Sequence, residues 1–197
     1  MTKIKFCGLT REEDIFIANE ILPEFAGFVF FEKSRRSISQ KNFLALKKIL
    51  DKKISAVGVF VDEKIPIVAE IAKNLDFIQL HGNEDEKYIS ALKNFTDKKI
   101  IKAFKIKSAD DLKIAENFLS DYILLDGGAG DGKIFDWQIL KNFGRKYFLA
   151  GGLNCENVSD AIKLLKPFAV DVSSGIETNF LKDAEKMKKF AQIVRGK

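Results

Sequence analysis

The sequence has few of the residues on which several protein classes depend. Its 197 residues include only two cysteines, far apart and not in a CxxC pair, so we expect no disulfide scaffold and no metal site. Three prolines and no Ser-rich or Pro-rich stretch leave no candidate linker, which predicts one domain over residues 1–197. No apolar run approaches the roughly 20 residues that cross a bilayer, and the start MTKIKFCGLT lacks the apolar segment of a signal peptide. We therefore expect a cytoplasmic protein without a membrane partner.

The charge is modestly positive. Lys and Arg number 33 against 28 Asp and Glu, a net charge of +5, and many lysines lie in helix-like segments such as KNFLALKKILDKK. This pattern is typical of solvated helix faces. No aromatic residues alternate with the basic ones in a recognition motif, so we expect no nucleic-acid partner. A positive field still favours a small phosphorylated substrate.

Short apolar runs alternate regularly with amphipathic segments along the chain. Strand-like runs lie at residues 4–7, 27–31, 56–61, 77–80, 100–104, 122–125, 147–150 and 168–172. Helical patterns lie at residues 14–21, 43–50, 66–73, 86–95, 109–119, 138–143, 158–165 and 184–194. Eight strand–helix units predict an α/β fold, a single-domain (β/α)8 TIM barrel. An open doubly wound sheet is the alternative, but it would place its Gly-rich turn early, whereas here such turns follow the last three strands.

Four reactive side chains are predicted to meet at the mouth of this barrel. Side chains alternate along a strand, so Lys5 and Cys7 share the face opposite Ile4 and Phe6. By the same parity Asp171 and His81 face the barrel axis, and Asp126 ends its strand just before a Gly-rich loop. The carboxyl ends of barrel strands are where catalytic groups gather.

Each of these residues also has a simpler interpretation. Cys7 could fill the core, and Asp126 could cap a turn. Asp171 could hydrogen-bond Lys5 inside the barrel, and His81 could satisfy loop backbone. Their joint placement favours the catalytic interpretation.

Two loops have the composition of a phosphate site. Glycine allows backbone N–H groups to approach an anion, and a following helix N-terminus favours negative charge. These loops come after the seventh and eighth strands, where barrels often bind phosphate. The residues concerned are Gly151, Gly152, Asn154, Ser173, Ser174 and Gly175. Ordinary tight turns are the alternative. Separately, Arg35 and Arg36 follow the second strand, where one of them could hold a carboxylate while the other is solvated.

Several of these segments together resemble the phosphoribosylanthranilate isomerase family. They are KFCGLT, GFVFFEKSRRSIS, VGVFVDE, IQLHGNED, LLDGGAGDGKIFDW, LAGGLNCENV and DVSSGIE, in order from Lys5 to Glu177. The resemblance implies an Amadori rearrangement in tryptophan biosynthesis. It converts N-(5-phosphoribosyl)anthranilate to 1-(2-carboxyphenylamino)-1-deoxyribulose 5-phosphate, with no metal or organic cofactor.

The resemblance also implies roles for individual residues. Cys7 would be the general base and Asp126 the general acid, while Arg36 would hold the anthranilate carboxylate. His81 would line the pocket, and Asp171 would steer the anthranilate amine. The glycine and serine loops would take the phosphate. We further expect a cation, Arg36 or Lys5, to lower the pKa of Cys7, and water to be scarce around Asp126.

One segment departs from the family pattern. The sixth loop often reads GGTG in the family, whereas here Asp131 replaces the usual threonine and the loop is short, which puts its closure in doubt. Other phosphosugar barrel enzymes, such as indole-glycerol-phosphate synthase, and a non-catalytic phosphosugar-binding barrel remain alternatives. A monomer and a homodimer are both compatible with the sequence.

Overall fold

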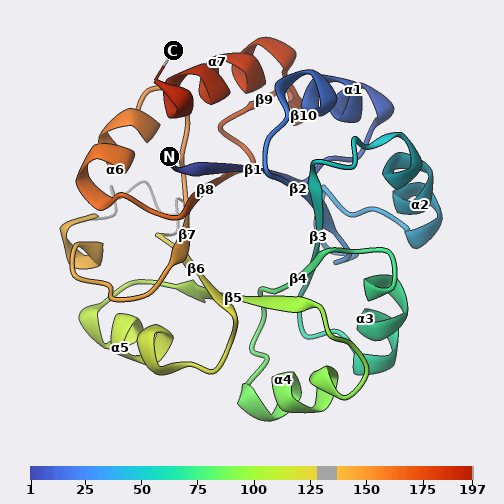
Figure 1. Cartoon of the computed structure of the whole chain (residues 1–197), viewed down its shortest axis with the longest axis vertical. Coiled ribbons are helices and arrows are strands. Elements are labelled where there is room, and N and C mark those ends of the chain that lie inside the picture. Colours follow the sequence, from blue (N-terminus) through green and yellow to red (C-terminus); the bar gives the residue numbers. More distant parts are fainter. Residues whose placement is uncertain (128–136, 197) are drawn as a thin grey trace.

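Eight parallel strands form a closed barrel in the computed structural model, which describes residues 1–127 and 137–196 (Figure 1). Neighbouring strands pair in sequence order, and β8 closes the barrel against β1. The strands are β1 Lys3–Cys7, β2 Phe25–Val29, β3 Ser55–Phe60, β4 Phe77–Leu80, β5 Lys99–Lys105, β6 Tyr122–Asp126, β7 Tyr147–Ala150 and β8 Ala169–Val172. The predicted (β/α)8 barrel is confirmed.

The helices form a ring outside the strands (Figure 1). They are α1 Glu12–Ile21, α2 Gln40–Ile49, α3 Ile65–Ala72, α4 Glu86–Lys93, α5 Ala109–Asn117, α6 Val158–Leu165 and α7 Ala184–Arg195. Ser39, Asp85, Ser108 and Asp183 each cap a helix by accepting a backbone N–H in its first turn. Within the part of the chain that is described, no helix combines the length and the apolar character needed to cross a membrane.

The prediction of a helix at residues 138–143 is wrong. This segment contains only a short 3₁₀ helix, η2 Trp137–Leu140, continued by i→i+3 bonds such as Phe143 N–H to Leu140 O. Directly after it, Arg145 donates to the carbonyls of Phe118 and Ser120, which ties the chain to the end of α5. These long-range bonds hold the chain after η2 against the end of α5, where a continued helix would have to displace them. The second strand also begins at Phe25, two residues before the predicted start, because its pairing with β3 begins there.

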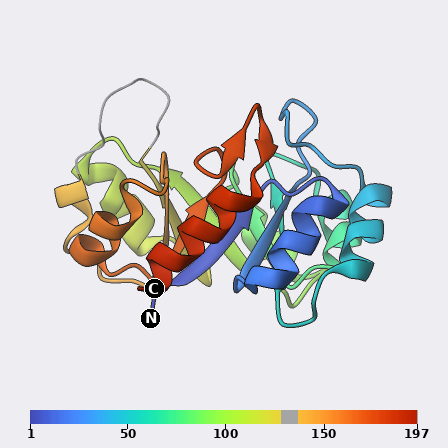
Figure 2. The same cartoon turned by 90° about the horizontal axis from the view of Figure 1, so that it is seen from above.

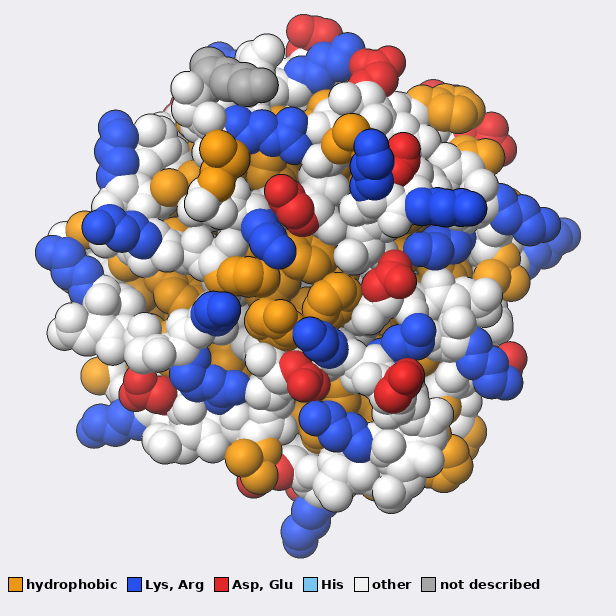
Figure 3. Space-filling view, viewed as in Figure 1, with side chains coloured by type: hydrophobic (Ala, Val, Ile, Leu, Met, Phe, Trp, Pro, Cys, Tyr) orange, Lys and Arg blue, Asp and Glu red, His pale blue; other side chains and the backbone are white. Residues whose placement is uncertain are grey.

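The two ends of the barrel differ. Both termini lie at one end, and a hairpin of β9 Glu177–Thr178 and β10 Leu181–Lys182 rises from the other (Figure 2). Inside the end that carries the termini, five aromatic rings pack against one another. They are Phe25, Phe77, Tyr122, Phe148 and Phe168. Figure 3 shows the end of the barrel that carries the termini. Hydrophobic side chains gather at its centre, with lysines and arginines around them. The opposite end, at the carboxyl ends of the strands, holds the cavity described next.

Candidate active site

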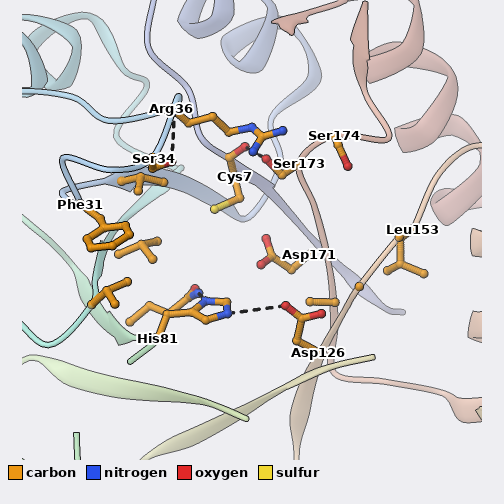
Figure 4. Close-up of a pocket in the computed structure, with 17 residues that line it drawn as sticks. Cys7, Phe31, Ser34, Arg36, His81, Asp126, Leu153, Asp171, Ser173 and Ser174 are labelled. Carbon is orange, nitrogen blue, oxygen red and sulfur yellow. Dashed lines mark hydrogen bonds and ion pairs between the residues drawn. The ribbon is translucent and has the colours of Figure 1, made fainter. Parts of the chain in front are cut away.

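A cavity of about 390 Å³ opens at the carboxyl ends of the strands. Nine of the sequence-predicted site residues line it (Figure 4). They are Cys7, Arg36, His81, Asp126, Gly151, Gly152, Asp171, Ser173 and Ser174. The thiol of Cys7 and the carboxyl of Asp126 thus open onto one space, although they lie on strands β1 and β6. Asn154 and Gly175 do not line the cavity.

Local packing fixes the position of Cys7. It is the last residue of β1 and pairs with Gly27 of β2, where an added Cβ would come within 2.8 Å of the Cys7 sulfur. The next residue, Gly8, has φ +78°, a left-handed conformation that turns the chain away from the barrel. Cys7 is therefore a nearly buried thiol, 8% exposed, at the floor of the cavity.

A buried ion pair lies beside this thiol. Lys5 is completely buried, and its Nζ donates to Asp171 Oδ1 at 2.9 Å. Lys5 and Cys7 lie on the same face of β1, as the strand parity predicted. Burial alone would lower the pKa of Lys5, but the charges of Asp171 and then Cys7 raise it above its ordinary value. Lys5 is therefore a cation between a carboxylate and the thiol.

The net effect on the thiol differs from the prediction. We expected a nearby cation to lower the pKa of Cys7. Lys5 does act in that direction, but burial is the larger effect and raises the pKa of Cys7 above its ordinary value of 9.0, with the charge of Asp171 adding to it. The predicted net lowering is wrong because the sequence could not show how completely the thiol is removed from water.

Asp126 and His81 face each other across the cavity. His81 Nε2 lies 3.5 Å from Asp126 Oδ2 (Figure 4). The amide of Gln79 donates to His81 Nδ1 at 2.9 Å, which leaves the histidine N–H on Nε2, toward the carboxylate. The Asp126 side chain is 27% exposed, so it is less shielded from water than the sequence predicted.

Gln79 was not singled out as a site residue, yet it lines the cavity and is 1% exposed. Within residues 1–127 and 137–196, its Oε1 is the only buried side-chain polar atom without a hydrogen-bond partner. A buried carbonyl oxygen of this kind is costly unless a ligand or water donates to it.

The two loops of the predicted phosphate site are joined to each other. Gly151 and Gly152 have φ of +94° and +67°, and a backbone bridge connects Asn154 to Gly175. A Cβ on Gly175 would overlap the carbonyl oxygen of Leu153, so this close approach requires glycine. Asn154 accepts the N–H groups of Glu156 and Asn157 before α6. Asn154 and Gly175 therefore shape the loops, while Gly151, Gly152, Ser173 and Ser174 line the cavity.

The adjacent arginines go to different places. Arg36 lines the cavity and donates from Nε and Nη2 to the two carboxylate oxygens of Glu177, both at 2.7 Å. The guanidinium of Arg35 lies 4.3 Å from the ring centre of Phe180. Only Arg36 is therefore placed to meet a ligand.

Sequence reasoning missed several parts of the site. Val29, Phe31, Val59 and Val61 form an apolar wall, which strand parity could have indicated. Glu177 lies in the DVSSGIE segment but had no assigned role, and nothing in the sequence pointed to its partner Lys182. Outside residues 128–136 and 197, no group of three or more His, Cys, Asp or Glu side chains could hold a metal ion.

Fold and site together define a barrel enzyme equipped for acid–base chemistry. The family model of N-(5'-phosphoribosyl)anthranilate isomerase matches residues 4–193. The chain belongs to this family of isomerases, as its resemblance predicted. Enzymes of this name from Caldanaerobacter subterraneus and Thermoanaerobacter sp. are 48% and 46% identical to it, over 100% of this chain and 99% of each relative.

Solved structures of the family agree. The isomerase from Thermotoga maritima superimposes with a TM-score of 0.92 at 35% identity, with both chains covered completely. A second structure, with a TM-score of 0.90 at 34% identity and the same coverage, is a complex with reduced 1-(o-carboxyphenylamino)-1-deoxyribulose 5-phosphate. A further one describes monomers generated from the dimeric Thermotoga maritima enzyme. The departure at Asp131 lies outside the described residues.

Proposed function

We propose that this chain catalyses the Amadori rearrangement of N-(5-phosphoribosyl)anthranilate to 1-(2-carboxyphenylamino)-1-deoxyribulose 5-phosphate, a step of tryptophan biosynthesis. The observation that carries this proposal is the shared cavity. A thiol and a carboxyl open onto it, and so do a pair of glycine and serine loops and an arginine (Figure 4).

The reaction requires one acid and one base. Asp126 protonates the furanose ring oxygen while the lone pair of the anthranilate amine expels it, so the C1′–O bond breaks and a protonated Schiff base forms. Cys7, as thiolate, then removes the C2′ proton and gives an enolamine, which tautomerises to the amino ketone. Atoms and electrons balance within the substrate, and general acid–base catalysis of this kind contributes typically about 10²–10⁴-fold per group.

Lys5 favours the thiolate form of Cys7 against the effect of burial. Burial raises the pKa of the Cys7 thiol, and the charge of Lys5 is the largest effect that lowers it. His81 faces the Asp126 carboxyl at 3.5 Å and orients it toward the ring oxygen. The base and the acid are thus each supported by a neighbouring side chain.

The remaining groups hold the two ends of the substrate. Arg36 receives the anthranilate carboxylate, and the apolar wall that contains Phe31 receives the aromatic ring. The loops at Gly151–Gly152 and Ser173–Ser174 bind the phosphate through backbone N–H groups and hydroxyls. Asp171 accepts from the anthranilate amine, and a ribose hydroxyl donates to the unpartnered Oε1 of Gln79.

The test is fluorescence-monitored consumption of phosphoribosylanthranilate by the purified protein. Cys7→Ala and Asp126→Ala should each lose about 10²–10⁴-fold in kcat with little change in KM, because each acts in the transition state. Cys155→Ser is the matched control, since this second cysteine is half-buried beside α7 and should be dispensable. A Cys7→Ala variant with near-normal kcat would remove the thiol from the mechanism.

The same preparation separates the alternatives. Turnover of indole-glycerol-phosphate synthase substrate, or binding of a phosphorylated product analogue without turnover, would favour another phosphosugar enzyme or a binding module. The single catalytic domain over residues 1–197, the cytoplasmic location and the choice between monomer and homodimer stay predictions.

A further inference from the structure

We infer that Glu177 and Lys182 are positioning residues that hold Arg36 and Ser173 as one unit, so that the two ends of the substrate are bound at a fixed separation. This inference rests on the proposed function, because it concerns the groups that take the substrate carboxylate and phosphate. Neither residue lines the cavity itself.

Glu177 has both carboxylate oxygens occupied. Oε1 accepts from Arg36 Nε at 2.7 Å and from Lys182 Nζ at 2.6 Å, and Oε2 accepts from Arg36 Nη2 at 2.7 Å. The Glu177 side chain is only 5% exposed. Burial alone would raise its pKa, but the hydrogen bonds from Arg36 and then Lys182 hold the pKa below its ordinary value. Glu177 is therefore an ionised, nearly buried anchor.

This contact leaves the far end of the Arg36 guanidinium available. Glu177 binds side-on and uses the Nε–H and one N–H of Nη2, out of the five N–H groups of the guanidinium. The two N–H groups of Nη1 and the second one of Nη2 have no protein acceptor among the described residues. They form a second fork, and a planar fork of this kind suits a substrate carboxylate. The Glu177 carboxylate thus orients the Arg36 guanidinium so that its free N–H groups can bind the substrate carboxylate.

Lys182 extends the anchor to the phosphate loop. It lies in β10, and its side chain is 2% exposed. Its Nζ contacts the carbonyl oxygen and the hydroxyl of Ser173 at 3.1 and 3.3 Å, in addition to Glu177. An ammonium has three N–H groups, so all are used within the protein. Lys182 is therefore an anchor and has no N–H left for the phosphate.

The same connection reaches the base. Ser173 Oγ donates to the backbone carbonyl of Cys7 at 3.0 Å. A continuous path thus runs from Arg36 through Glu177, Lys182 and Ser173 to the end of β1. Two cations and one carboxylate also leave a single net positive charge, which suits a site that binds an anion at each end of its substrate.

A purely structural role would predict lower thermal stability with unchanged ligand affinity. The positioning role predicts a different result, namely selective loss of affinity for one end of the substrate. Anthranilate and inorganic phosphate are suitable probes, because each carries only one of the two anionic groups. Anthranilate binding can be titrated by its own fluorescence, and phosphate binding by its protection against thermal unfolding.

Glu177→Gln should raise KM about tenfold and weaken anthranilate binding by a similar factor, with kcat within about threefold, since it removes a charged hydrogen-bond partner of Arg36. Phosphate binding should change less. Lys182→Met should instead weaken phosphate binding by about tenfold. Lys186→Met is the matched control, because Lys186 donates to the backbone carbonyl of Glu177 and leaves its carboxylate untouched. Its KM and its dissociation constants for anthranilate and phosphate should then match those of the wild type.

Unchanged anthranilate binding in Glu177→Gln would overturn the inference, whatever happens to its melting temperature. If that variant does not fold, Glu177→Asp gives the same test, because the shorter carboxylate cannot keep both contacts with Arg36. Wild-type turnover reports separately on the proposed function. A wild type that binds both probes, yet has no turnover, would refute the function and leave the variant comparison intact.

Discussion

Lys5→Met is the sharpest test of the electrostatics around the base. Lys5 is completely buried, with its Nζ 2.9 Å from Asp171 and beside the Cys7 thiol. Methionine keeps the length and most of the volume of the side chain while it removes the charge. The substitution therefore tests the effect of the Lys5 charge on Cys7 separately from the effect of side-chain packing around β1.

The expected effect on the thiol is large. Two unit charges about 4 Å apart at an effective dielectric constant of about 20 interact by about 4 kcal/mol, which equals about three pKa units. Asp171 shares the charge of Lys5, so only part of this interaction favours the thiolate, and we expect the pKa of Cys7 to rise further in the variant. At neutral pH the thiolate fraction, and with it kcat/KM, should then fall by about 10- to 1000-fold.

The assay is the pH dependence of kcat/KM. The thiolate is the active form, so activity rises with pH until the thiol has ionised, and a higher pKa moves this rise to higher pH. Lys5→Met should regain activity in alkaline buffer. Thiolate absorbance in a Cys155→Ser background would report the same titration directly. Loss of activity that is independent of pH would refute the reasoning.

Stability has to be separated from activity. Removing Lys5 leaves the buried Asp171 carboxylate without its cation, which should lower the free energy of unfolding by about 3–5 kcal/mol. The pKa of Lys5 is raised above its ordinary 10.5, so this contribution is fully present at neutral pH and is lost only as pH rises through the higher, folded value. Lys102→Met is the matched control. It breaks another buried pair, with Glu84 at 3.0 Å, and should lower stability without moving the titration of Cys7.

Three further substitutions test other parts of the molecule. Arg36→Met should raise KM with kcat little changed, since it removes ground-state binding of the carboxylate, and unchanged KM in steady-state assays would assign that role elsewhere. Gly175→Ala should weaken phosphate binding, because its Cβ would push the loop away from Leu153, and a thermal-shift titration with phosphate measures this effect. Phe148→Ala should lower the free energy of unfolding by about 3–5 kcal/mol in denaturant titrations, because it empties the ring cluster at the closed end of the barrel.

The barrel and its inward-facing residues could be predicted because they depend on short-range pattern. A strand repeats every two residues, so the apolar Ile4 and Phe6 assign the opposite face to Lys5 and Cys7 without any knowledge of the fold. Closure followed from eight regular strand–helix units. Once the barrel is assumed, the carboxyl ends of its strands must share one edge, and this brings Cys7 and Asp126 to one cavity.

The parts that sequence could not show depend on long-range partners. Arg36 and Glu177 are 141 residues apart, and no local pattern indicates that they pair. Lys182 lies in a strand of two residues, which is too short to show the alternation of apolar and polar residues that predicts a strand. The end of η2 is followed by hydrogen bonds from Arg145 to the last turn of α5 and to Phe118, about 30 residues away in the chain. The direction of the Cys7 pKa likewise depends on the balance between burial and one cation, which only coordinates reveal.

The shared position of Lys5 suggests that substrate binding itself activates the base. In the free protein the charge of Lys5 is divided between Asp171 and Cys7. A substrate amine that donates to Asp171 would weaken its hold on Lys5 and leave more of the cation to favour the thiolate. The pKa of Cys7 should then be lower in the complex than in the free enzyme. Because kcat reports the complex and kcat/KM the free enzyme, the rise of kcat with pH should lie below that of kcat/KM. Coincident rises would show that Asp171 keeps Lys5 when substrate is bound.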